Sequence, residues 1–129
     1  MAKNIKTIPT SDYLAVISVV ENYVAGLKVG DATQVSKCFH PEATMYGFAA
    51  DGSLLGGPIS NLWTFMETYG AAPKIVARSD IISITPTTAV VKVDMEEDAA
   101  GNDYTDNHTL LKFEGKWVII AKVFHCYGK

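Results

Sequence analysis

Several features are missing from this sequence of 129 residues, and each absence excludes a class of protein. Nowhere do about 18 apolar residues run together, so no membrane-spanning helix is predicted and no membrane contact is expected. No apolar stretch follows the charged residues near Met1, so no signal peptide is visible and we expect a cytoplasmic protein. Two cysteines are too few for a disulfide framework.

Excess positive charge and the common cofactor motifs are also missing. Eleven Lys and Arg residues stand against fourteen Asp and Glu residues, which gives a net charge of −3 and disfavours nucleic acid as a partner. The sequence has no glycine-rich phosphate loop, nucleophile elbow or dinucleotide fingerprint. We therefore expect no cofactor.

Four residues carry side chains that zinc prefers, namely Cys38, His40, His125 and Cys126. Their spacing matches no recognised zinc motif. Neighbouring residues on a strand point to opposite faces, so His125 and Cys126 could bind one ion together only beyond the end of the strand. We expect no metal site.

The residues that are present suit one globular domain. Apolar residues make up 48% and charged residues 19% of the chain, as in globular proteins. At this length the sequence predicts a single domain over residues 1–129, with residues 1–10 flexible or arm-like.

Apolar residues in the first half recur at helical spacing. The three predicted helices run from Tyr13 to Lys28, from Asp31 until Pro41 stops the second, and from Pro58 until Gly70. Thr10 or Ser11 can cap the first helix, and Gly30 offers it a left-handed end.

Residues typical of strands fill most of the remaining chain. Two short strands are predicted at 44–48 and 53–55, and four long strands at 75–85, 89–98, 104–113 and 117–124. The short turns between the long strands require an antiparallel meander. Helices followed by a long sheet are typical of the α+β class, with the helices packed against one face.

The last strand is apolar on both faces, with Lys122 as the exception. Because three helices cover only one face of a sheet, we expect a second subunit to cover the other in a homodimer. A monomer with a few exposed apolar side chains is the alternative.

The order of these elements resembles that of the nuclear-transport-factor-2-like (NTF2-like, or cystatin-like α+β) superfamily, which includes SnoaL-like polyketide cyclases and ketosteroid isomerases. The motifs most similar to its lumazine-binding branch are Phe39-His40-Pro41, Tyr46-Gly47, Leu55-Gly56-Gly57-Pro58, Tyr104-Thr105-Asp106 and Lys122-Val123-Phe124-His125. The resemblance implies a strongly curved, mostly antiparallel sheet that three helices close into a cone. It also implies that the interior holds a small, flat, mostly apolar or heteroaromatic ligand.

Tyr23 falls where the ketosteroid isomerases place their oxyanion-stabilising tyrosine, so the resemblance implies a hydrogen-bond donor to a carbonyl or enolate. The isomerase base aligns with Gly47, however, and the second acidic donor aligns with Thr109. Without these two groups we expect no ketosteroid isomerisation. A core tyrosine with a satisfied hydroxyl is the alternative.

His125 and Asp106 form the candidate catalytic pair, with His125 as the acid or base and Asp106 as the group that orients it. If Glu114 and Gly115 alone form the hairpin loop and no bulge intervenes, Asp106 lies diagonal to His125 on the same face. If Lys116 also belongs to the loop, Asp106 points to the opposite face. A purely structural pair is the alternative.

The other candidate ligand-binding residues are Tyr23, His40, Tyr46, Tyr104 and His108. His108 lies two residues from Asp106 and therefore on the same face of its strand. Tyr46 and Tyr104 could stack on a flat ligand at the mouth of the cavity. Alternatively, His40 stabilises the carbonyl end of the second helix as a cation.

Two functions stay open at this point. The first is a small-molecule-binding cone, with or without lyase or isomerase activity. The second is a non-enzymatic dimeric binding or docking module whose interior is filled. A hollow interior distinguishes the first from the second.

Overall fold

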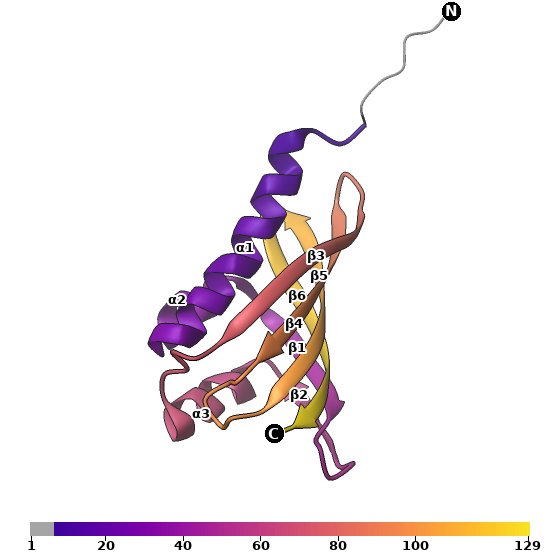
Figure 1. Ribbon diagram of the computed structural model, residues 1–129. Coiled ribbons are helices and arrows are strands. Elements are labelled where there is room, and N and C mark those ends of the chain that lie inside the picture. Colours follow the sequence, from indigo (N-terminus) through magenta and orange to yellow (C-terminus); the bar gives the residue numbers. More distant parts are fainter. Residues whose placement is uncertain (1–6) are drawn as a thin grey trace, which may run out of the picture.

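The computed structural model describes residues 7–129 and shows three helices on the inner side of one curled, unclosed sheet of six strands (Figure 1). The helices are α1 (Thr10–Val29), α2 (Ala32–Ser36) and α3 (Ser60–Tyr69). The strands are β1 (Phe39–Phe48), β2 (Leu54–Pro58), β3 (Val76–Ile84), β4 (Thr88–Glu96), β5 (Asp103–Phe113) and β6 (Lys116–Gly128). The predicted α+β class and the order of the elements are confirmed.

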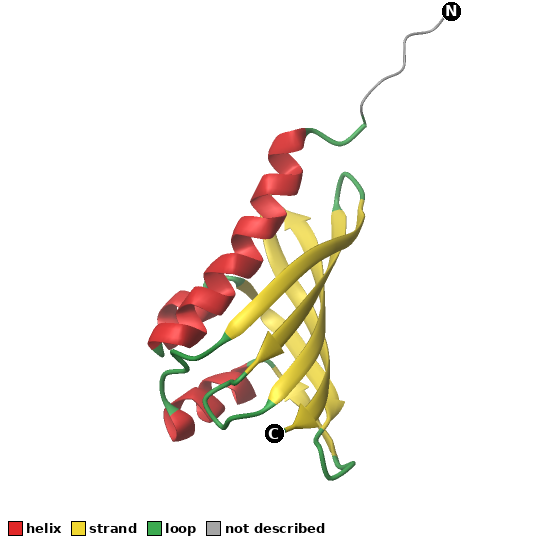
Figure 2. Cartoon of the chain, in the orientation of Figure 1, coloured by secondary structure: helices red, strands yellow, loops and turns green. Residues whose placement is uncertain are grey.

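The sheet order is β2-β1-β6-β5-β4-β3, and every neighbouring pair is antiparallel except β1 with β6. Figure 2 shows the helices on the concave side of the sheet, with α3 beside the end where β2 lies. In residues 7–129, no helix combines the length and the apolar character needed to cross a bilayer. The curl leaves an interior between the sheet and the helices.

Several element boundaries differ from the prediction. Pro41 was expected to end the second helix, but it lies within β1, in an irregular stretch of the pairing with β6 where a missing N–H costs no ladder bond. Pro58 was expected to begin the third helix, but it still pairs with Thr44 at the end of β2, and α3 starts at Ser60. The last strand extends to Gly128.

The beginning of α1 lies one turn earlier than the periodicity indicates. Pro9 precedes the helix without a side-chain cap, and Thr10 is its first residue. Residues 1–6 of the expected arm lie outside the described residues, whereas Ile8 is buried. At the other end Gly30 adopts the left-handed conformation, with φ of 74°, as predicted.

A buried layer of mostly β-branched and aliphatic side chains joins α1 to the sheet. Val16 and Val20 of α1 are completely buried, as are Val91 of β4, Leu110 of β5 and Ile119 of β6. Each such side chain contributes about 1.5–3 kcal/mol by leaving water. This layer fixes the helix against the sheet, so residues near the end of α1 reach the interior from a rigid base.

A polar contact fastens the first turn of α1 to the last hairpin. Asp12 is buried, and its Oδ1 lies 3.2 Å from Nζ of Lys112 and 3.4 Å from Nε1 of Trp117. The two donors come from β5 and β6. The carboxylate therefore links a helix to two strands that are distant in sequence.

A β-bulge in β6 decides which side chains reach the interior. The hairpin loop consists of Glu114 and Gly115, because Phe113 pairs with Lys116. Farther along, Leu110 pairs with Ile119 but Thr109 pairs with Ala121, so Ile120 is an extra residue on β6. Beyond such an extra residue, every side chain points to the face opposite to the one that uninterrupted alternation along the strand would give it.

Candidate functional site

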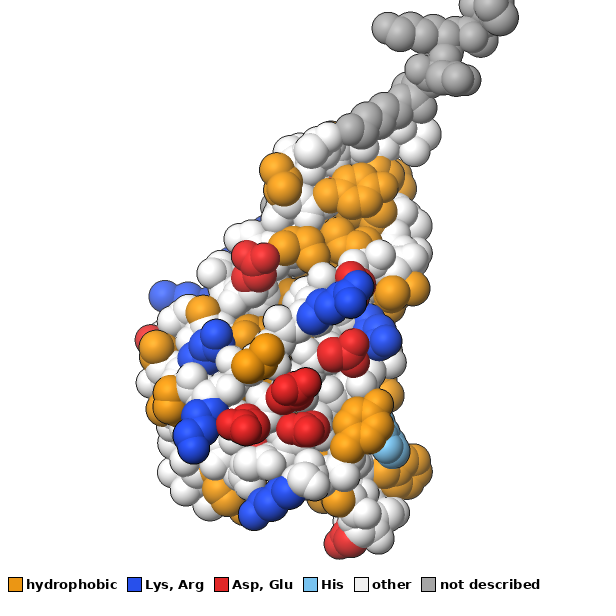
Figure 3. All heavy atoms as spheres, viewed as in Figure 1, with side chains coloured by type: hydrophobic (Ala, Val, Ile, Leu, Met, Phe, Trp, Pro, Cys, Tyr) orange, Lys and Arg blue, Asp and Glu red, His pale blue; other side chains and the backbone are white. Residues whose placement is uncertain are grey.

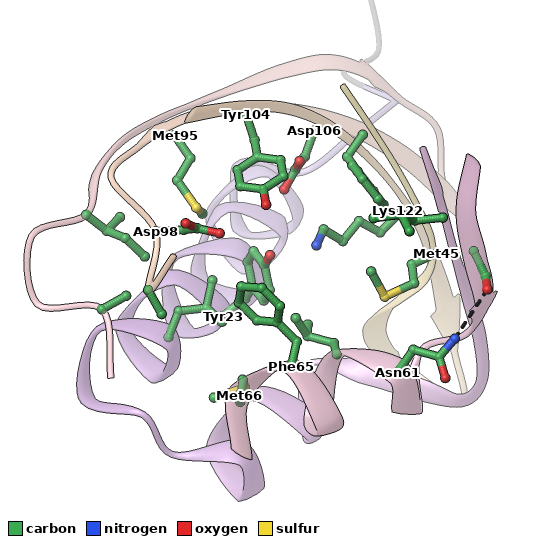
Figure 4. Close-up of a pocket in the computed structure, with 18 of the residues that line it drawn as sticks. Tyr23, Met45, Asn61, Phe65, Met66, Met95, Asp98, Tyr104, Asp106 and Lys122 are labelled. Atoms are coloured by element: carbon green, nitrogen blue, oxygen red, sulfur yellow. Dashed lines mark hydrogen bonds between the residues drawn. The ribbon is translucent and has the colours of Figure 1, made fainter. Parts of the chain in front are cut away.

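A cavity of about 310 Å³ lies between the sheet, α1 and α3 (Figure 4). The expectation of a hollow interior is met, and the filled interior of the alternative hypothesis is not found. Most of its walls are apolar. The apolar lining side chains are Leu27, Met45, Leu55, Leu62, Phe65, Met66, Ala72, Ile75, Met95, Ala99 and Phe124.

A small polar group is built into this apolar wall. Tyr23 comes from α1, Tyr104 and Asp106 from β5, and Lys122 from β6. In Figure 4 the amine of Lys122 and the hydroxyl of Tyr104 point into the cavity, with the carboxylate of Asp106 beside them. A few convergent polar groups in an apolar pocket are typical of a small-molecule site.

Asp106 is 2% exposed, and its Oδ1 has no hydrogen-bond partner among residues 7–129. Burial by itself would raise the pKa of this carboxyl, but the charge of Lys122 and the neighbouring His108 outweigh burial and hold the pKa below its usual value. The group is therefore a carboxylate at neutral pH. A buried carboxylate with a free oxygen at a cavity wall is available to a ligand.

His108 lies behind Asp106, completely buried, and is not part of the cavity lining. Its Nε2 is 3.6 Å from Oδ2 of Asp106, which is longer than a hydrogen bond. Burial lowers the pKa of the imidazole more than Asp106 raises it, so the ring is neutral at pH 7. The ring also packs edge-on against Tyr23, with centroids 5.0 Å apart. The expectation that His108 faces the ligand is therefore wrong, because core packing encloses it.

Lys122 is 7% exposed, which is unusual for a lysine. Its Nζ lies 5.8 Å from the ring centre of Tyr23 and 5.3 Å from that of Phe124. The hydrogen bonds and ion pairs found within residues 7–129 do not include this amine. Aromatic faces hold it in the cavity and leave its N–H groups free for a ligand.

The two tyrosines of the site remain protonated. Burial raises the pKa of Tyr23 well above its ordinary value, and the charge of Asp106 adds to the effect. Burial also raises the pKa of Tyr104, with a further contribution from Asp98. Both phenols are therefore hydrogen-bond donors at any physiological pH, which suits a carbonyl oxygen.

The expected pairing of Asp106 with His125 is wrong. The two-residue hairpin loop was the correct alternative. However, the bulge at Ile120 shifts the register by one residue, so that Asp106 pairs with Phe124 and Thr105 pairs with His125. His125 therefore lies on the outer face, exposed, with its ring 4.7 Å from that of Tyr127. Asp106 faces the interior, where His108 and Lys122 are its neighbours.

Two other predicted ligand-binding residues lie away from the cavity. Tyr46 is 46% exposed and pairs with Val123 on the outer face of the sheet. His40 lies in β1, where its Nδ1 accepts a hydrogen bond from the backbone N–H of Glu42 and its ring packs against Phe113. It does not cap a helix, because α2 ends at Ser36.

One of the acidic residues on the surface of the protein also lines the cavity. Figure 3 shows acidic side chains gathered on one face, over β3, β4 and the loop after β4. Asp98 in this loop lines the cavity, and its Oδ1 accepts hydrogen bonds from the backbone N–H groups of Ala100 and Asn102, both at 2.9 Å. This carboxylate shapes the loop at the rim.

The cysteines take no part in the cavity. Cys38 and Cys126 are both buried and free, and burial raises the pKa of the Cys38 thiol to about 11. No three His, Cys, Asp or Glu side chains within residues 7–129 come together in a way that could hold a metal ion.

Sequence reasoning missed Lys122 as a site residue. Its signal was present, since it is the one charged residue on an otherwise apolar face of the last strand. A charged side chain on a buried face is costly and therefore marks a functional site. Asn61, whose Nδ2 donates to the carbonyl of Gly56 at 3.2 Å, was missed as well and carried no such signal.

Comparisons with known proteins agree with this architecture. Residues 11–125 match the family described as "Putative lumazine-binding". The chain is 41% identical over 124 residues to the aldolase FrzH of Cladobotryum sp, covering 96% of this chain and 98% of that protein.

Solved structures give the same result. An NTF2-like protein of unknown function from Shewanella baltica superposes with a TM-score of 0.86 at 31% identity, covering 96% of this chain and 100% of that one. An NTF2-like protein of unknown function from Methylobacillus flagellatus superposes with a TM-score of 0.84 at 30% identity, covering 92% of this chain and 94% of that one. The family match covers most of the chain, and both solved structures share its fold and about a third of its sequence. The chain therefore belongs to the lumazine-binding family of the NTF2-like superfamily.

Proposed function

We propose that this protein is a small-molecule lyase that makes or breaks a carbon–carbon bond next to a carbonyl group, as in an aldol reaction. The observation that carries the proposal is the ionised carboxylate of Asp106, whose Oδ1 has no hydrogen-bond partner, in the same apolar cavity as the amine of Lys122. The 41% identity with a protein named as an aldolase supports it. The family itself suggests small-molecule binding.

The chemistry follows from what each group can do. An aldol reaction requires a base that removes a proton from the carbon next to the carbonyl, and Asp106 is the buried base available. The enolate that forms carries negative charge on oxygen. The amine of Lys122 and the hydroxyls of Tyr23 and Tyr104 are the donors that stabilise this charge, and they act more strongly in an apolar cavity than in water.

The shape of the cavity defines the class of ligand. Aromatic rings of Phe65, Tyr104 and Phe124 lie among its walls, and its volume of about 310 Å³ is at the small end of ligand pockets. A flat, mostly apolar ketone or aldehyde suits these walls. His125 has no role in the proposal, because it lies on the outer face.

Deuterium exchange tests proton abstraction without knowledge of the natural substrate. Small aromatic ketones and aldehydes that stabilise the protein in a thermal-shift screen are incubated with it in heavy water. Loss of the signal of the protons next to the carbonyl is then followed by NMR. We expect exchange with the wild-type protein and a loss of about 100-fold or more in Asp106→Asn.

Asp94→Asn is the matched control, since it neutralises a half-buried carboxylate that lies on β4, opposite Thr105 on the outer face. We expect it to exchange at the wild-type rate. Equal exchange by wild type and Asp106→Asn would show that Asp106 is not the base.

We also propose that the outer face mediates a homodimer. It exposes an apolar patch, which we call the outer patch, made of Tyr46, Phe48, Val123, His125 and Tyr127. Large contiguous apolar patches are typical of interfaces. Sedimentation should give a dimer for the wild type and a monomer for Val123→Glu, while Ile82→Glu on β3, at the far edge of the sheet, stays dimeric. A monomeric wild type would rule the dimer out.

A further inference from the structure

We propose that the amine of Lys122 bonds covalently to the ligand, forming a Schiff base with the carbonyl carbon. This inference rests on the proposed function, because it assumes that a carbonyl compound enters the cavity. Lys122 then acts as a nucleophile and goes beyond the role of a positive charge near the carbonyl oxygen.

The first support is the position of the amine. Nζ of Lys122 points into the cavity from β6 and is bordered by the rings of Tyr23 and Phe124, at 5.8 and 5.3 Å from their centres (Figure 4). The amine is also nearly shielded from bulk water, at 7% exposure. A carbonyl compound that binds among these aromatic walls can place its carbonyl group within reach of Nζ.

The second support is the lack of a tight partner. Lys92 lies 3.6 Å from Asp94 and Lys112 lies 3.2 Å from Asp12, so each is held by a carboxylate. Within the described chain no such ion pair is found for Lys122. An amine that is locked in an ion pair cannot attack a carbonyl carbon, whereas Lys122 can turn toward one.

The third support is the supply of proton carriers around the amine. The Asp106 carboxylate can take one proton from the ammonium group, which gives the neutral amine needed for attack. The hydroxyls of Tyr23 and Tyr104 remain protonated and can donate a hydrogen bond to the carbonyl oxygen. Asp106 can then return its proton to that oxygen.

The reaction balances without any further reagent. Nζ forms a bond to the carbonyl carbon, and the oxygen takes up a proton to give a carbinolamine. The carbon–oxygen bond then breaks and water leaves, so that one ammonium group and one ketone give one iminium ion and one water. The iminium ion acidifies the neighbouring C–H, whose proton passes to Asp106 and leaves an enamine. The enamine carbon then adds to the carbonyl carbon of a second group, whose oxygen takes the proton held by Asp106, and the iminium ion forms again. Addition of one water to this iminium ion releases the product and the lysine as an ammonium group.

A 1,3-diketone tests this inference directly, because it converts a reactive lysine into a stable conjugated enaminone with loss of one water. The full-length protein is incubated with benzoylacetone, and its intact mass is measured. We expect one diketone minus one water per chain. A modified Lys122 resists trypsin, so residues 117–129 should appear as one uncut peptide that carries the added mass.

Two variants make the test specific. Lys122→Arg keeps the positive charge but is not expected to form the adduct, and Lys116→Met removes an exposed lysine from the same strand and should react like the wild type. The chain contains nine other lysines, which report the background reaction. A wild-type adduct that is absent, or spread evenly over exposed lysines, would overturn the inference.

The outcome also separates this inference from the proposed function. If Lys122→Arg retains deuterium exchange at the wild-type rate, Lys122 serves only as a cation; the covalent step is then wrong, while proton abstraction by Asp106 stands. If Lys122 captures the diketone but no ketone undergoes exchange, the covalent site stands and the lyase proposal fails.

Discussion

Phe124 lies directly opposite Gly47 across the pairing of β1 with β6, and its ring occupies the space that a side chain at position 47 would need. A Cβ on Gly47 would be 2.6 Å from a ring carbon of Phe124, and it would also meet the backbone oxygen of that residue. Position 47 aligns with the base of the ketosteroid isomerases. No acidic side chain fits there, and the carboxylate of this cavity comes from Asp106 instead.

Gly47→Ala should therefore destabilise the protein by about 1–3 kcal/mol, because the backbone of β6 has to move. Urea unfolding measures the change. Gly56→Ala is the control: the atoms nearest to its Cβ would belong to the half-exposed side chain of Tyr46, which can swing away. If the two variants lose the same stability, the close approach to Phe124 is not the reason for the glycine.

His108 should make the stability of the protein depend on pH below about 6.5, the ordinary value for an unfolded histidine. Since the pKa is lowered in the folded state, the unfolded chain binds a proton there and the folded chain does not. Stability therefore falls as pH drops below that value, with a slope of up to about 1.4 kcal/mol per pH unit. Asp106, whose folded pKa is also lowered, adds a loss only below about pH 4.

Urea unfolding at pH 5, 6 and 7 measures this slope. His108→Leu should reduce it by the contribution of one proton, whereas Asn107→Ala, which removes an exposed neighbouring side chain that does not titrate, should leave it unchanged. An unchanged slope in His108→Leu would contradict a neutral buried imidazole.

Filling the cavity should block ligand binding without unfolding the protein. Ala99 lines the cavity and its neighbour Ala100 does not. Ala99→Trp should reduce benzoylacetone capture at least tenfold, and Ala100→Trp should capture at the wild-type rate. Mass spectrometry at fixed times gives both rates. Equal capture by the two variants would place the reactive lysine outside this cavity.

The contact of Asp12 with Lys112 and Trp117 should contribute measurably to stability. Asp12→Ala leaves the buried indole N–H without its acceptor, and we expect a loss of about 1–2 kcal/mol. Asp12→Asn keeps an acceptor for Trp117 and should lose less. Thermal unfolding monitored by circular dichroism ranks the two. A larger loss for the asparagine variant would show that the charge, and not the hydrogen bond, stabilises this contact.

The fold was predictable because it depends on periodicity, which many residues reinforce. The apolar spacing of α1 and the long strands of the second half identify a helix and a meander, and Glu114 with Gly115 marks the last turn, although only the pairing of Phe113 with Lys116 decides the loop length. The pairing of Asp106 could not be predicted in the same way. It depends on one extra residue, Ile120, whose side chain carries no signature of a bulge.

Positions in the cavity wall were predictable where the strand has no interruption. Tyr23 of α1 and Tyr104 of β5 line the cavity, and so does Asp106, in the arrangement that follows from a two-residue hairpin loop. On β6 the bulge at Ile120 shifts the register by one residue. His125 therefore lies on the outer face and Lys122 on the inner face, the opposite of what simple alternation predicts. A prediction of burial from alternation alone fails wherever a strand contains such a bulge.

The extra residue at Ile120 also makes the inner face of β6 tolerant of one change in length. Because Leu110 pairs with Ile119 and Thr109 with Ala121, loss of Ile120 would leave every later pair in place and keep Lys122 and Phe124 inside the chamber. The same loss from a strand without a bulge would exchange its inward and outward side chains. Relatives that are one residue shorter at this point should therefore keep a lysine chamber, whereas regular pairing of Ile120 with Thr109 would give a histidine chamber.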